Sequence, residues 1–274
     1  MKIALTGASG MMGSRFIELN AGAHTIIPFS STDLDITDES KTEEILARTD
    51  FDILLHLAAY TNVNGAELEK EKAHAINVNG TRNVFNAVQN LKKQMIYIST
   101  DFVFDGNLAP FDELSTPSPV GYYAETKYEG EKIVEKNAMI VRISYPYGYS
   151  SPIKQDFMWK MQSLLSEGKT LNMITDSAMN PTFIDDVVSG LYYLATHYEP
   201  TIYHLVGSKS YTPFEVGTII AKRYGFSSEL IQPTTFQEFS KGNAPRPQYS
   251  IITSTRNTFQ PMRNFEEGLA LLKT

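Results

Sequence analysis

A phenol, an amine and a hydroxyl are spaced in this chain so that together they could move a proton. The apolar run 95–98 leads into Ser99 and Thr100, and Tyr123 stands four residues before Lys127. Four residues are about one helical turn, so the phenol and the amine are expected on one face of a helix. A free phenol has a pKa near ~10, and a neighbouring ammonium lowers it because it favours the phenolate. With a hydroxyl to hold a substrate oxygen, this set is typical of proton exchange with an alcohol or a ketone.

A second pair, Tyr128 and Lys132, has the same spacing, as chance allows in a chain with 15 tyrosines. The two tyrosines are five residues apart, a rotation of roughly 140° on a helix, so the two pairs cannot share a face. We therefore expect only one pair to do chemistry. Tyr123 is favoured because it lies where its helix begins, next to the edge at which the preceding strand ends.

A glycine-rich turn follows the first predicted strand. Residues 2–6 are apolar and run into Gly7-Ala8-Ser9-Gly10-Met11-Met12-Gly13, and a helical pattern follows over 14–19. In such a strand–turn–helix unit, glycines let backbone N–H groups approach a pyrophosphate, and the helix N-terminus adds partial positive charge. The spacing, G-x-x-G-x-x-G, predicts a dinucleotide site, although an ordinary strand–helix turn remains the alternative.

The end of the second predicted strand, 24–29, bears on the choice of dinucleotide. In this position an acid favours NAD and a basic residue favours NADP, because the ribose is held there. Hydroxyl side chains come first in this chain and acids follow: Ser30, Ser31, Thr32, Asp33 and Asp35. Hydroxyls tolerate a 2′-phosphate, so NADP(H) is favoured and NAD(H) stays open.

Composition and charge exclude several classes of protein and site. The chain has 274 residues, of which 42% are hydrophobic and 20% charged, which is ordinary for a soluble globular protein. A net charge of −7 argues against nucleic acid or an anionic membrane as the main partner. Without cysteine there is no disulfide or thiolate chemistry, and no metal site is predicted. No apolar run approaches ~18 residues, and a cytoplasmic protein is expected.

The predicted elements alternate between strand and helix. Strands are expected over 51–57, 95–98 and 139–143, and helices over 67–89 and 123–136. This alternation predicts an α/β protein with a Rossmann-type doubly wound parallel sheet. The candidate ligand residues directly follow strands, at the edge where open parallel sheets bind ligands.

The alternation loosens after residue 150. We expect a dinucleotide-binding domain over 1–150, completed by parts of 175–210. A smaller α/β substrate-binding lobe is expected over 151–274, closely packed on the first domain because no repeat or low-complexity linker separates them.

Several stretches resemble the extended short-chain dehydrogenase/reductases, and within them the dTDP-4-dehydrorhamnose reductase family. The resemblance covers nearly the whole chain. It is carried by the glycine turn 7–13, Leu34–Asp38, Ala58–Thr61, Ser99–Gly106, Tyr123–Lys127, Pro181–Asp186 and Arg246-Pro247. The segment Ser99–Gly106 is specific to this branch, whereas the glycine turn and Tyr-x-x-x-Lys mark only the superfamily.

The resemblance implies an NADP(H)-dependent reductase of a nucleotide-linked 4-keto sugar. Thr100 would polarise the ketone oxygen, Tyr123 would give the proton, and Lys127 would lower the pKa of Tyr123 and bind the nicotinamide ribose. The implied cofactor-binding residues are Gly7, Gly10, Met11, Met12, Asp35, Ile36, Leu57, Ala58, Ala59, Tyr60, Ser99, Tyr123 and Lys127. The implied substrate-binding residues are Val63, Thr100, Phe102, Tyr145 and Arg246.

The chain departs from the family pattern mainly on the substrate side. The family usually has Val-Asp where Val63-Asn64 stand, a tryptophan near Tyr145, Tyr-Gly at Tyr123-Ala124, and an asparagine at Tyr249. These differences leave the reductase chemistry in place and the identity of the sugar open.

Two other functions fit the same residues. A sugar-nucleotide epimerase or dehydratase of the superfamily would use the same fold, and a dehydratase would need an extra acid, for which Asp101 is the candidate. A non-catalytic regulatory subunit would keep the cofactor site and bind a partner enzyme. A homodimer is compatible with the sequence, which contains no direct sign of one.

Overall fold

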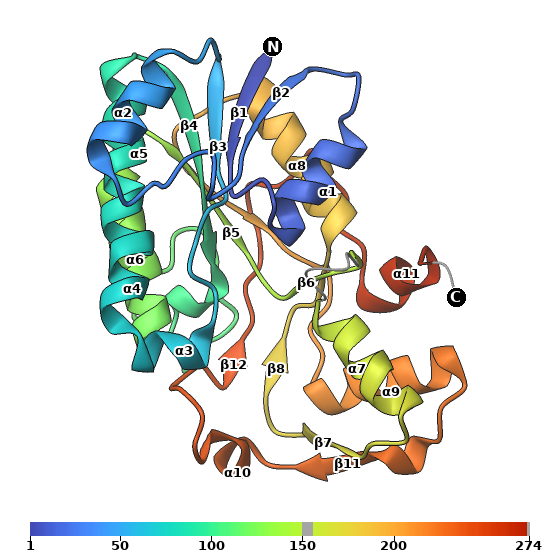
Figure 1. Cartoon of the computed structure of the whole chain (residues 1–274). Helices are drawn as coiled ribbons and strands as arrows, with labels where there is room; N and C mark the ends of the chain where they lie inside the picture. The colour runs from blue at the N-terminus through green and yellow to red at the C-terminus, as the bar shows by residue number, and fades with distance from the viewer. Residues whose placement is uncertain (150–155, 273–274) are drawn as a thin grey trace.

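Six parallel strands form the central sheet of the computed structural model, which describes residues 1–149 and 156–272. The strands are β1 (Lys2–Thr6), β2 (Thr25–Phe29), β3 (Ile53–His56), β4 (Gln94–Thr100), β5 (Met139–Ile143) and β10 (Ile202–Leu205). Their order is β10-β5-β4-β3-β1-β2 (Figure 1). Continuous apolar runs suit this arrangement because both faces of a parallel sheet are covered. The predicted doubly wound parallel sheet is confirmed.

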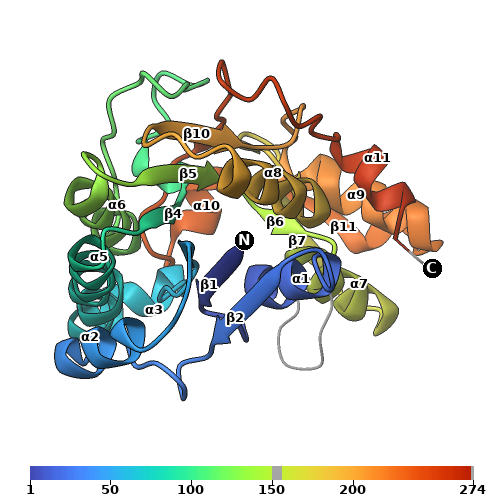
Figure 2. The same ribbon diagram turned by 90° about the horizontal axis from the view of Figure 1, so that it is seen from above.

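Helices cover both faces of the sheet (Figures 1 and 2). On one face lie α1 (Met11–Leu19) and α8 (Ile184–Thr196), and on the other lie α2 (Glu39–Ala47), α5 (Thr81–Asn90) and α6 (Tyr122–Val134). Alternate residues of β1 serve the two layers: Ile3 and Leu5 pack in the α1–α8 layer, and Ala4 packs in the other. Two separate apolar cores therefore share the one sheet, one on each face.

The predicted single helix over 67–89 is wrong. The structure has instead α3 (Val63–Leu68), α4 (Lys70–His74), a π-helical turn (Ala75–Gly80) and α5. The cause is Asn77, a buried residue whose Oδ1 accepts from the Tyr60 N–H (2.8 Å) and whose Nδ2 donates to Thr126 Oγ1 (3.0 Å). The π-helical turn lets the Asn77 side chain point to Tyr60 and Thr126. Such turns are frequent at functional sites.

A smaller lobe follows the sheet strands. It contains α7 (Phe157–Ser166), β7 (Leu171–Ile174), α9 (Pro213–Tyr224), β11 (Ile231–Thr234), α10 (Phe236–Ser240) and α11 (Phe265–Ala270). Short parallel pairs connect it to the sheet ends: β6 (Pro146–Tyr147) with β9 (Thr182–Phe183), and β8 (Ala178–Met179) with β12 (Tyr249–Ser250). There are also 3₁₀ turns at Asp101–Val103 and Ser228–Leu230. The predicted domain boundary at 150–151 lies outside the described residues.

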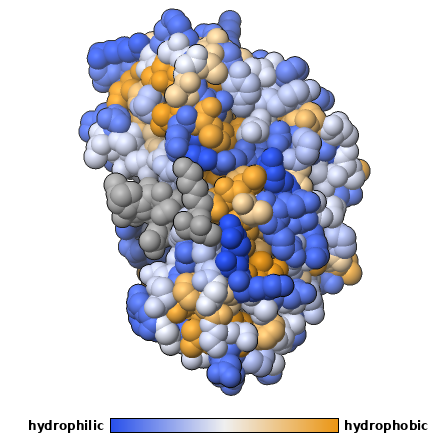
Figure 3. All heavy atoms as spheres, turned by 90° about the vertical axis from the view of Figure 1, so that its right-hand side faces the viewer, coloured by the Kyte–Doolittle hydropathy of each residue, from blue (hydrophilic) through white to orange (hydrophobic). Residues whose placement is uncertain are grey.

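The surface on the α11 side is mixed in polarity. Apolar residues gather at mid-height, with hydrophilic residues around them (Figure 3). No helix within residues 1–149 and 156–272 is long and apolar enough to cross a membrane.

A buried ion pair joins α6 to the sheet. The Arg142 guanidinium donates to both Glu131 oxygens, at 2.8 and 2.7 Å, and neither residue is more than 2% exposed. Arg142 also donates to Nε2 of His204 (3.4 Å), whose Nδ1 faces the Thr253 carbonyl at 2.7 Å. Nδ1 therefore carries the proton, and the ring is neutral, in line with burial lowering the pKa of His204 to about 4.

Removing one partner of this pair should destabilise the fold strongly. We expect Glu131→Ala to lower the free energy of unfolding by about 3–5 kcal/mol, because Arg142 is left as an uncompensated buried charge. Urea unfolding followed by circular dichroism measures the change. Glu238→Ala is the matched control, since Glu238 pairs with Lys241 on the surface. Equal urea midpoints for the two variants would contradict this assignment.

Candidate active site

A cavity of about 860 Å³ lies at the carboxyl ends of the central strands. Such an edge is where open α/β sheets bind ligands. Fourteen of the residues singled out from the sequence line it: Gly7, Gly10, Met11, Met12, Asp35, Ile36, Leu57, Ala58, Ala59, Ser99, Thr100, Tyr123, Lys127 and Tyr145. Four others, Tyr60, Val63, Phe102 and Arg246, are not part of the lining.

The glycine turn sits where the order of the strands reverses, between β1 and β3. Gly7 has φ +70°, and a Cβ there would lie 2.7 Å from the Ala58 nitrogen. Only glycine allows this backbone approach. Gly10 precedes α1 without any side-chain cap, so first-turn N–H groups of α1 have no cap beside the cavity. Unpaired N–H groups at a helix N-terminus attract phosphate.

The end of the cavity beside β2 is lined by hydroxyl side chains. Ser30 and Ser31 line it, and Ser30 donates through its N–H to the Asp33 carboxylate (2.8 Å). Among the lining residues of the described ranges, Lys127 at the opposite end is the only basic one.

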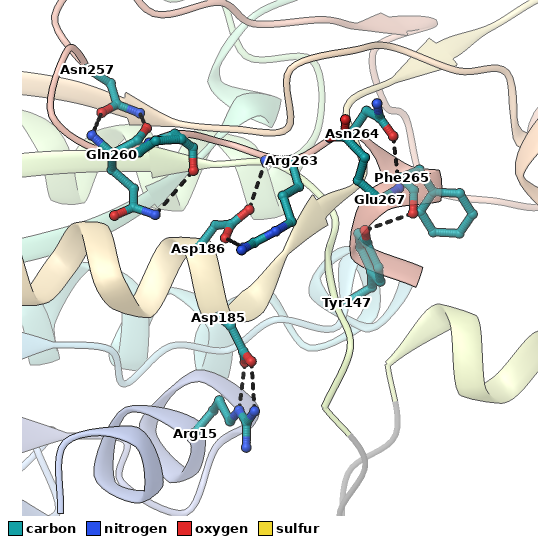
Figure 4. A network of polar contacts seen from close by, with 11 residues as sticks. Arg15, Tyr147, Asp185, Asp186, Asn257, Gln260, Arg263, Asn264, Phe265 and Glu267 are labelled. Carbon is teal, nitrogen blue, oxygen red and sulfur yellow. Dashed lines mark hydrogen bonds and ion pairs between the residues drawn. The ribbon is translucent and has the colours of Figure 1, made fainter. Parts of the chain in front are cut away.

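Arg15 of α1 points to α8, the neighbouring helix of the same layer. It donates to both carboxylate oxygens of Asp185 at 2.7 Å and so ties α1 to α8 (Figure 4). The next residue, Asp186, accepts from the Arg263 N–H at 2.8 Å. The motif Pro181–Asp186 thus holds the glycine-turn helix and the C-terminal segment together.

The catalytic candidates share the far end of the cavity, where Thr100 and Lys127 are buried and Tyr123 is half-buried. Lys127 Nζ donates to the Ile98 carbonyl (2.8 Å) and lies 4.2 Å from the centre of the Tyr97 ring. Burial lowers the pKa of Lys127 to about 7 and, with a smaller effect of Asp101, raises that of Tyr123 to about 12; the Thr100 hydroxyl opposes the rise.

The net pKa of Tyr123 is therefore raised in this structure, not lowered as the spacing to Lys127 alone would predict. The loss of solvation dominates at both groups, and it disfavours the charged form of each. The Lys127 amine bonds to a backbone carbonyl, and Tyr123 stays a neutral phenol across the ordinary pH range.

The alternative tyrosine lies outside this cavity. Tyr128 packs beside the small cluster of Val103 and Phe104, and Lys132 Nζ lies 5.0 Å from the centre of its ring. Of the two Tyr-x-x-x-Lys pairs, only Tyr123 and Lys127 line the cavity.

Asp101 organises the hydroxyls around Thr100. Its Oδ1 accepts from Thr100 Oγ1 (3.0 Å), and its Oδ2 accepts from Ser144 (2.8 Å) and from Ser250 of β12. Burial raises the pKa of Asp101 to about 6, although the three hydroxyls counteract it. Sequence reasoning missed Ser144 and Ser250. Ser144 follows a strand and so carried a local signal, whereas Ser250 lies far away in sequence.

An aromatic group separates the proton-donor candidate from the small lobe. The Phe102 ring lies 6.1 Å from the ring of Tyr123 and 5.9 Å from that of Tyr145. Tyr145 has φ +40°, a strained value for a tyrosine. Arg246 lies near enough to Tyr145 to affect its pKa, and Nη2 of Arg246 donates to Asn64 Oδ1 at 2.6 Å.

The side chains of two predicted residues lie outside the lining of the cavity. The Tyr60 hydroxyl donates to Glu69, and Val63 begins α3. Lining residues that the sequence did not identify include Thr61, Ile76, Ile143 and Phe157. Ile143 ends β5 and Thr61 lies in the loop after β3, so both could have been found, whereas Ile76 depends on the π-helical turn and Phe157 comes from the small lobe. No group of three or more His, Asp or Glu in the described ranges is arranged to hold a metal ion.

Known proteins match this chain over nearly its whole length. It is 30% identical to the dTDP-4-dehydrorhamnose reductase of Mycolicibacterium smegmatis, covering 98% of this chain and 84% of the relative. It is 26% identical to a dTDP-4-keto-6-deoxy-D-glucose reductase of Streptomyces niveus, covering 90% of this chain and 87% of the relative.

A solved structure agrees. The Bacillus anthracis dTDP-4-dehydrorhamnose reductase in complex with NADP superposes with a TM-score of 0.92 at 32% identity, covering 98% of this chain and 97% of that one. The sequence also matches the family described as RmlD substrate binding domain over residues 1–273. The resemblance read from the motifs is thereby confirmed, and the chain belongs to the RmlD substrate binding domain family of extended short-chain dehydrogenase/reductases.

Proposed function

We propose that this protein is an NADP(H)-dependent reductase of a nucleotide-linked 4-keto sugar, and that dTDP-4-dehydrorhamnose is its substrate. The observation that carries the proposal is that one cavity holds both the glycine turn and the set Thr100, Tyr123 and Lys127. A nicotinamide reductase needs these two features within reach of one elongated cofactor. The names of the relatives and the NADP bound to the B. anthracis enzyme support the same reading.

The cavity suits a dinucleotide. It runs from the phosphate-attracting turn at Gly7 to Thr100, and the buried Ser99 Oγ lacks a protein partner within the described residues. The residues that would hold the cofactor are Gly7, Gly10, Met11, Met12, Asp35, Ile36, Leu57, Ala58, Ala59, Ser99 and Lys127. Tyr60 would act through its backbone, which Asn77 fixes. Bound NADPH would supply a hydride to the ketone carbon.

The proton would come from Tyr123. Its raised pKa keeps the phenol protonated at working pH, so the group is always ready to donate. Donation leaves a phenolate in a buried site, and the nearby Lys127 ammonium would stabilise that charge better than water could. Thr100 would donate a hydrogen bond to the ketone oxygen and keep its proton, turning away from Asp101 to do so.

The sugar nucleotide would lie between the sheet and the smaller lobe. Tyr145, Phe102 and Val63 would border the sugar, and Arg246 would meet the diphosphate. We propose that the lobe after residue 150 is the substrate-binding unit. Related reductases are named for more than one 4-keto sugar.

A dehydratase is the less favoured candidate. Its extra acid would be Asp101, but both oxygens of that carboxylate are engaged by hydroxyls of the protein. A regulatory subunit would have no need of the set Thr100, Tyr123 and Lys127 in the cavity.

The proposal is tested with a panel of 4-keto nucleotide sugars and with NADPH or NADH, following the loss of reduced cofactor. We expect turnover with dTDP-4-dehydrorhamnose, and faster with NADPH than with NADH. Tight NADPH binding without turnover of any sugar would instead favour the regulatory subunit.

Replacing the proton donor should remove activity. We expect Tyr123→Phe to lower kcat by about 10²–10⁴-fold, because the ring stays in place and only the acidic hydroxyl is lost. Tyr128→Phe is the matched control and should keep kcat near that of the unmodified protein. If Tyr128→Phe were the inactive variant, the roles of the two pairs would be reversed.

The reduction should depend on the charge of Lys127. Its amine is protonated below its pKa of about 7 and neutral above it. We therefore expect kcat/KM for the sugar to fall above pH 7, by about tenfold for each pH unit, because the phenolate loses its stabilising cation.

Measuring kcat/KM against pH in variants shows which group causes the break near pH 7. Lys127→Met should be slow and lack the break near pH 7, since no ammonium can form at that position. Asp101→Asn should keep the break, which separates Lys127 from the other titrating group near Thr100. A break that persists in Lys127→Met would belong to another group.

A further inference from the structure

The short helix α3 touches two parts of the site that the sequence does not connect. It lies at the lower end of the layer formed by α4 and α6 (Figure 1). Asn64 and Glu67 are three residues apart, so their side chains leave the same face of α3. Asn64 bonds to the segment that carries Arg246, and Glu67 bonds to the start of the helix that carries Tyr123.

We propose that α3 is a brace with two separate duties: Glu67 positions the proton donor Tyr123, and Asn64 positions the substrate-binding Arg246. The inference rests on the proposed function and adds two positioning residues to it.

Glu67 caps α6 from outside that helix. Its Oε1 accepts from the Tyr122 N–H at 2.8 Å, and Tyr122 is the first residue of α6. The residue before it, Gly121, has no side chain to serve as a cap. A carboxylate at a helix N-terminus gains both a charge-assisted hydrogen bond and the favourable field of the helix. Glu67 thus fixes the turn from which Tyr123 projects.

The junction leaves little room for movement. A Cβ on Gly121 would lie 2.5 Å from the Pro245 carbonyl oxygen and 3.6 Å from Glu67 Oε1. The beginning of α6, α3 and the segment before Arg246 therefore meet at one point. Lys70 adds to the contact, with Nζ 3.9 Å from Glu67 Oε2 and 4.9 Å from the centre of the Tyr122 ring.

Asn64 binds the segment 243–246 through hydrogen bonds and adds no charge to it. Its Oδ1 accepts from the Ala244 N–H (3.0 Å) and from Arg246 Nη2 (2.6 Å), and its Nδ2 donates to Asn243 Oδ1 (2.9 Å). The Arg246 side chain also donates to the Ala244 carbonyl and lies over the Phe239 ring. No carboxylate of the described residues forms an ion pair with Arg246, so its positive charge is free to attract a diphosphate.

The two duties predict different kinetic effects. Glu67→Ala should lower kcat for the sugar by about tenfold, with KM within about twofold, because the lost cap loosens the proton donor. Glu67→Gln retains the acceptor oxygen and should recover most of kcat. Glu71→Ala, which removes an exposed acid of α4, is the matched control.

Asn64→Ala should raise KM by about tenfold with kcat within about twofold, since Arg246 loses an anchoring hydrogen bond. Asn64→Asp, the residue that the family usually has here, keeps the acceptor oxygen for Ala244 and Arg246 and should leave KM within about twofold. Calorimetry with dTDP measures the binding part without any turnover, and its Kd should rise about tenfold in Asn64→Ala only.

Hydrogen exchange at α6 completes the test. Amides over 122–125 should exchange faster in Glu67→Ala than in Glu67→Gln or Glu71→Ala, whether or not the protein reduces any sugar. If the unmodified protein reduces no sugar but the exchange and dTDP results hold, the proposed function fails and the brace stands. If Glu67→Ala and Asn64→Ala both match Glu71→Ala in exchange, dTDP binding and kinetics, the brace is refuted.

Discussion

The parallel direction of the six strands is the constraint on which the rest of this structure depends. Because all the strands point the same way, the residues that follow them meet at one edge, where Gly7, Ala58 and Thr100 line the same cavity although they are far apart in sequence. The order of the strands reverses between β1 and β3, which opens that edge for a ligand. The backbone contact of Gly7 with Ala58 brings the glycine turn tightly against the next strand end.

Burial then determines the chemistry of the side chains at this edge. Lys127 and Asp101 are buried and Tyr123 is half-buried, and in each the loss of solvation shifts the pKa so that the neutral form is favoured. Each keeps a hydrogen-bonding or electrostatic neighbour that makes its burial tolerable: the Ile98 carbonyl for Lys127, Thr100 for Tyr123, and three hydroxyls for Asp101. In such a site the proton donors are neutral before the reaction. Charge forms on them only during the reaction, and the fixed neighbouring groups can then stabilise it.

Features that depend on neighbouring residues could be predicted from the sequence, and those that depend on distant ones could not. A strand followed by glycines identified Gly7, and the start of a helix distinguished Tyr123 from Tyr128. The interrupted helix was missed because the π-helical turn serves Asn77, whose partner Thr126 is 49 residues away. Ser250 and Asp101 are separated by 149 residues, and Arg246 and Asn64 by 182. The spacing of Tyr123 and Lys127 alone predicted a lowered pKa for Tyr123. The loss of solvation, which only the fold creates, raises that pKa instead.

The two sides of the cavity are held in different ways. Close backbone contacts hold the cofactor and proton-donor side: a Cβ on Gly7 would strike Ala58, and one on Gly130 would lie 2.2 Å from the Tyr97 hydroxyl. Substitution there would displace whole elements. Side chains such as Asn64, Tyr145 and Arg246 hold the substrate side, and a side chain can change without moving a strand or a helix. The strained backbone of Tyr145, anchored by the Thr182 N–H on its carbonyl, keeps a large aromatic ring at the cavity wall. Selection for a different sugar can therefore act on these side chains while the reductase chemistry stays unchanged.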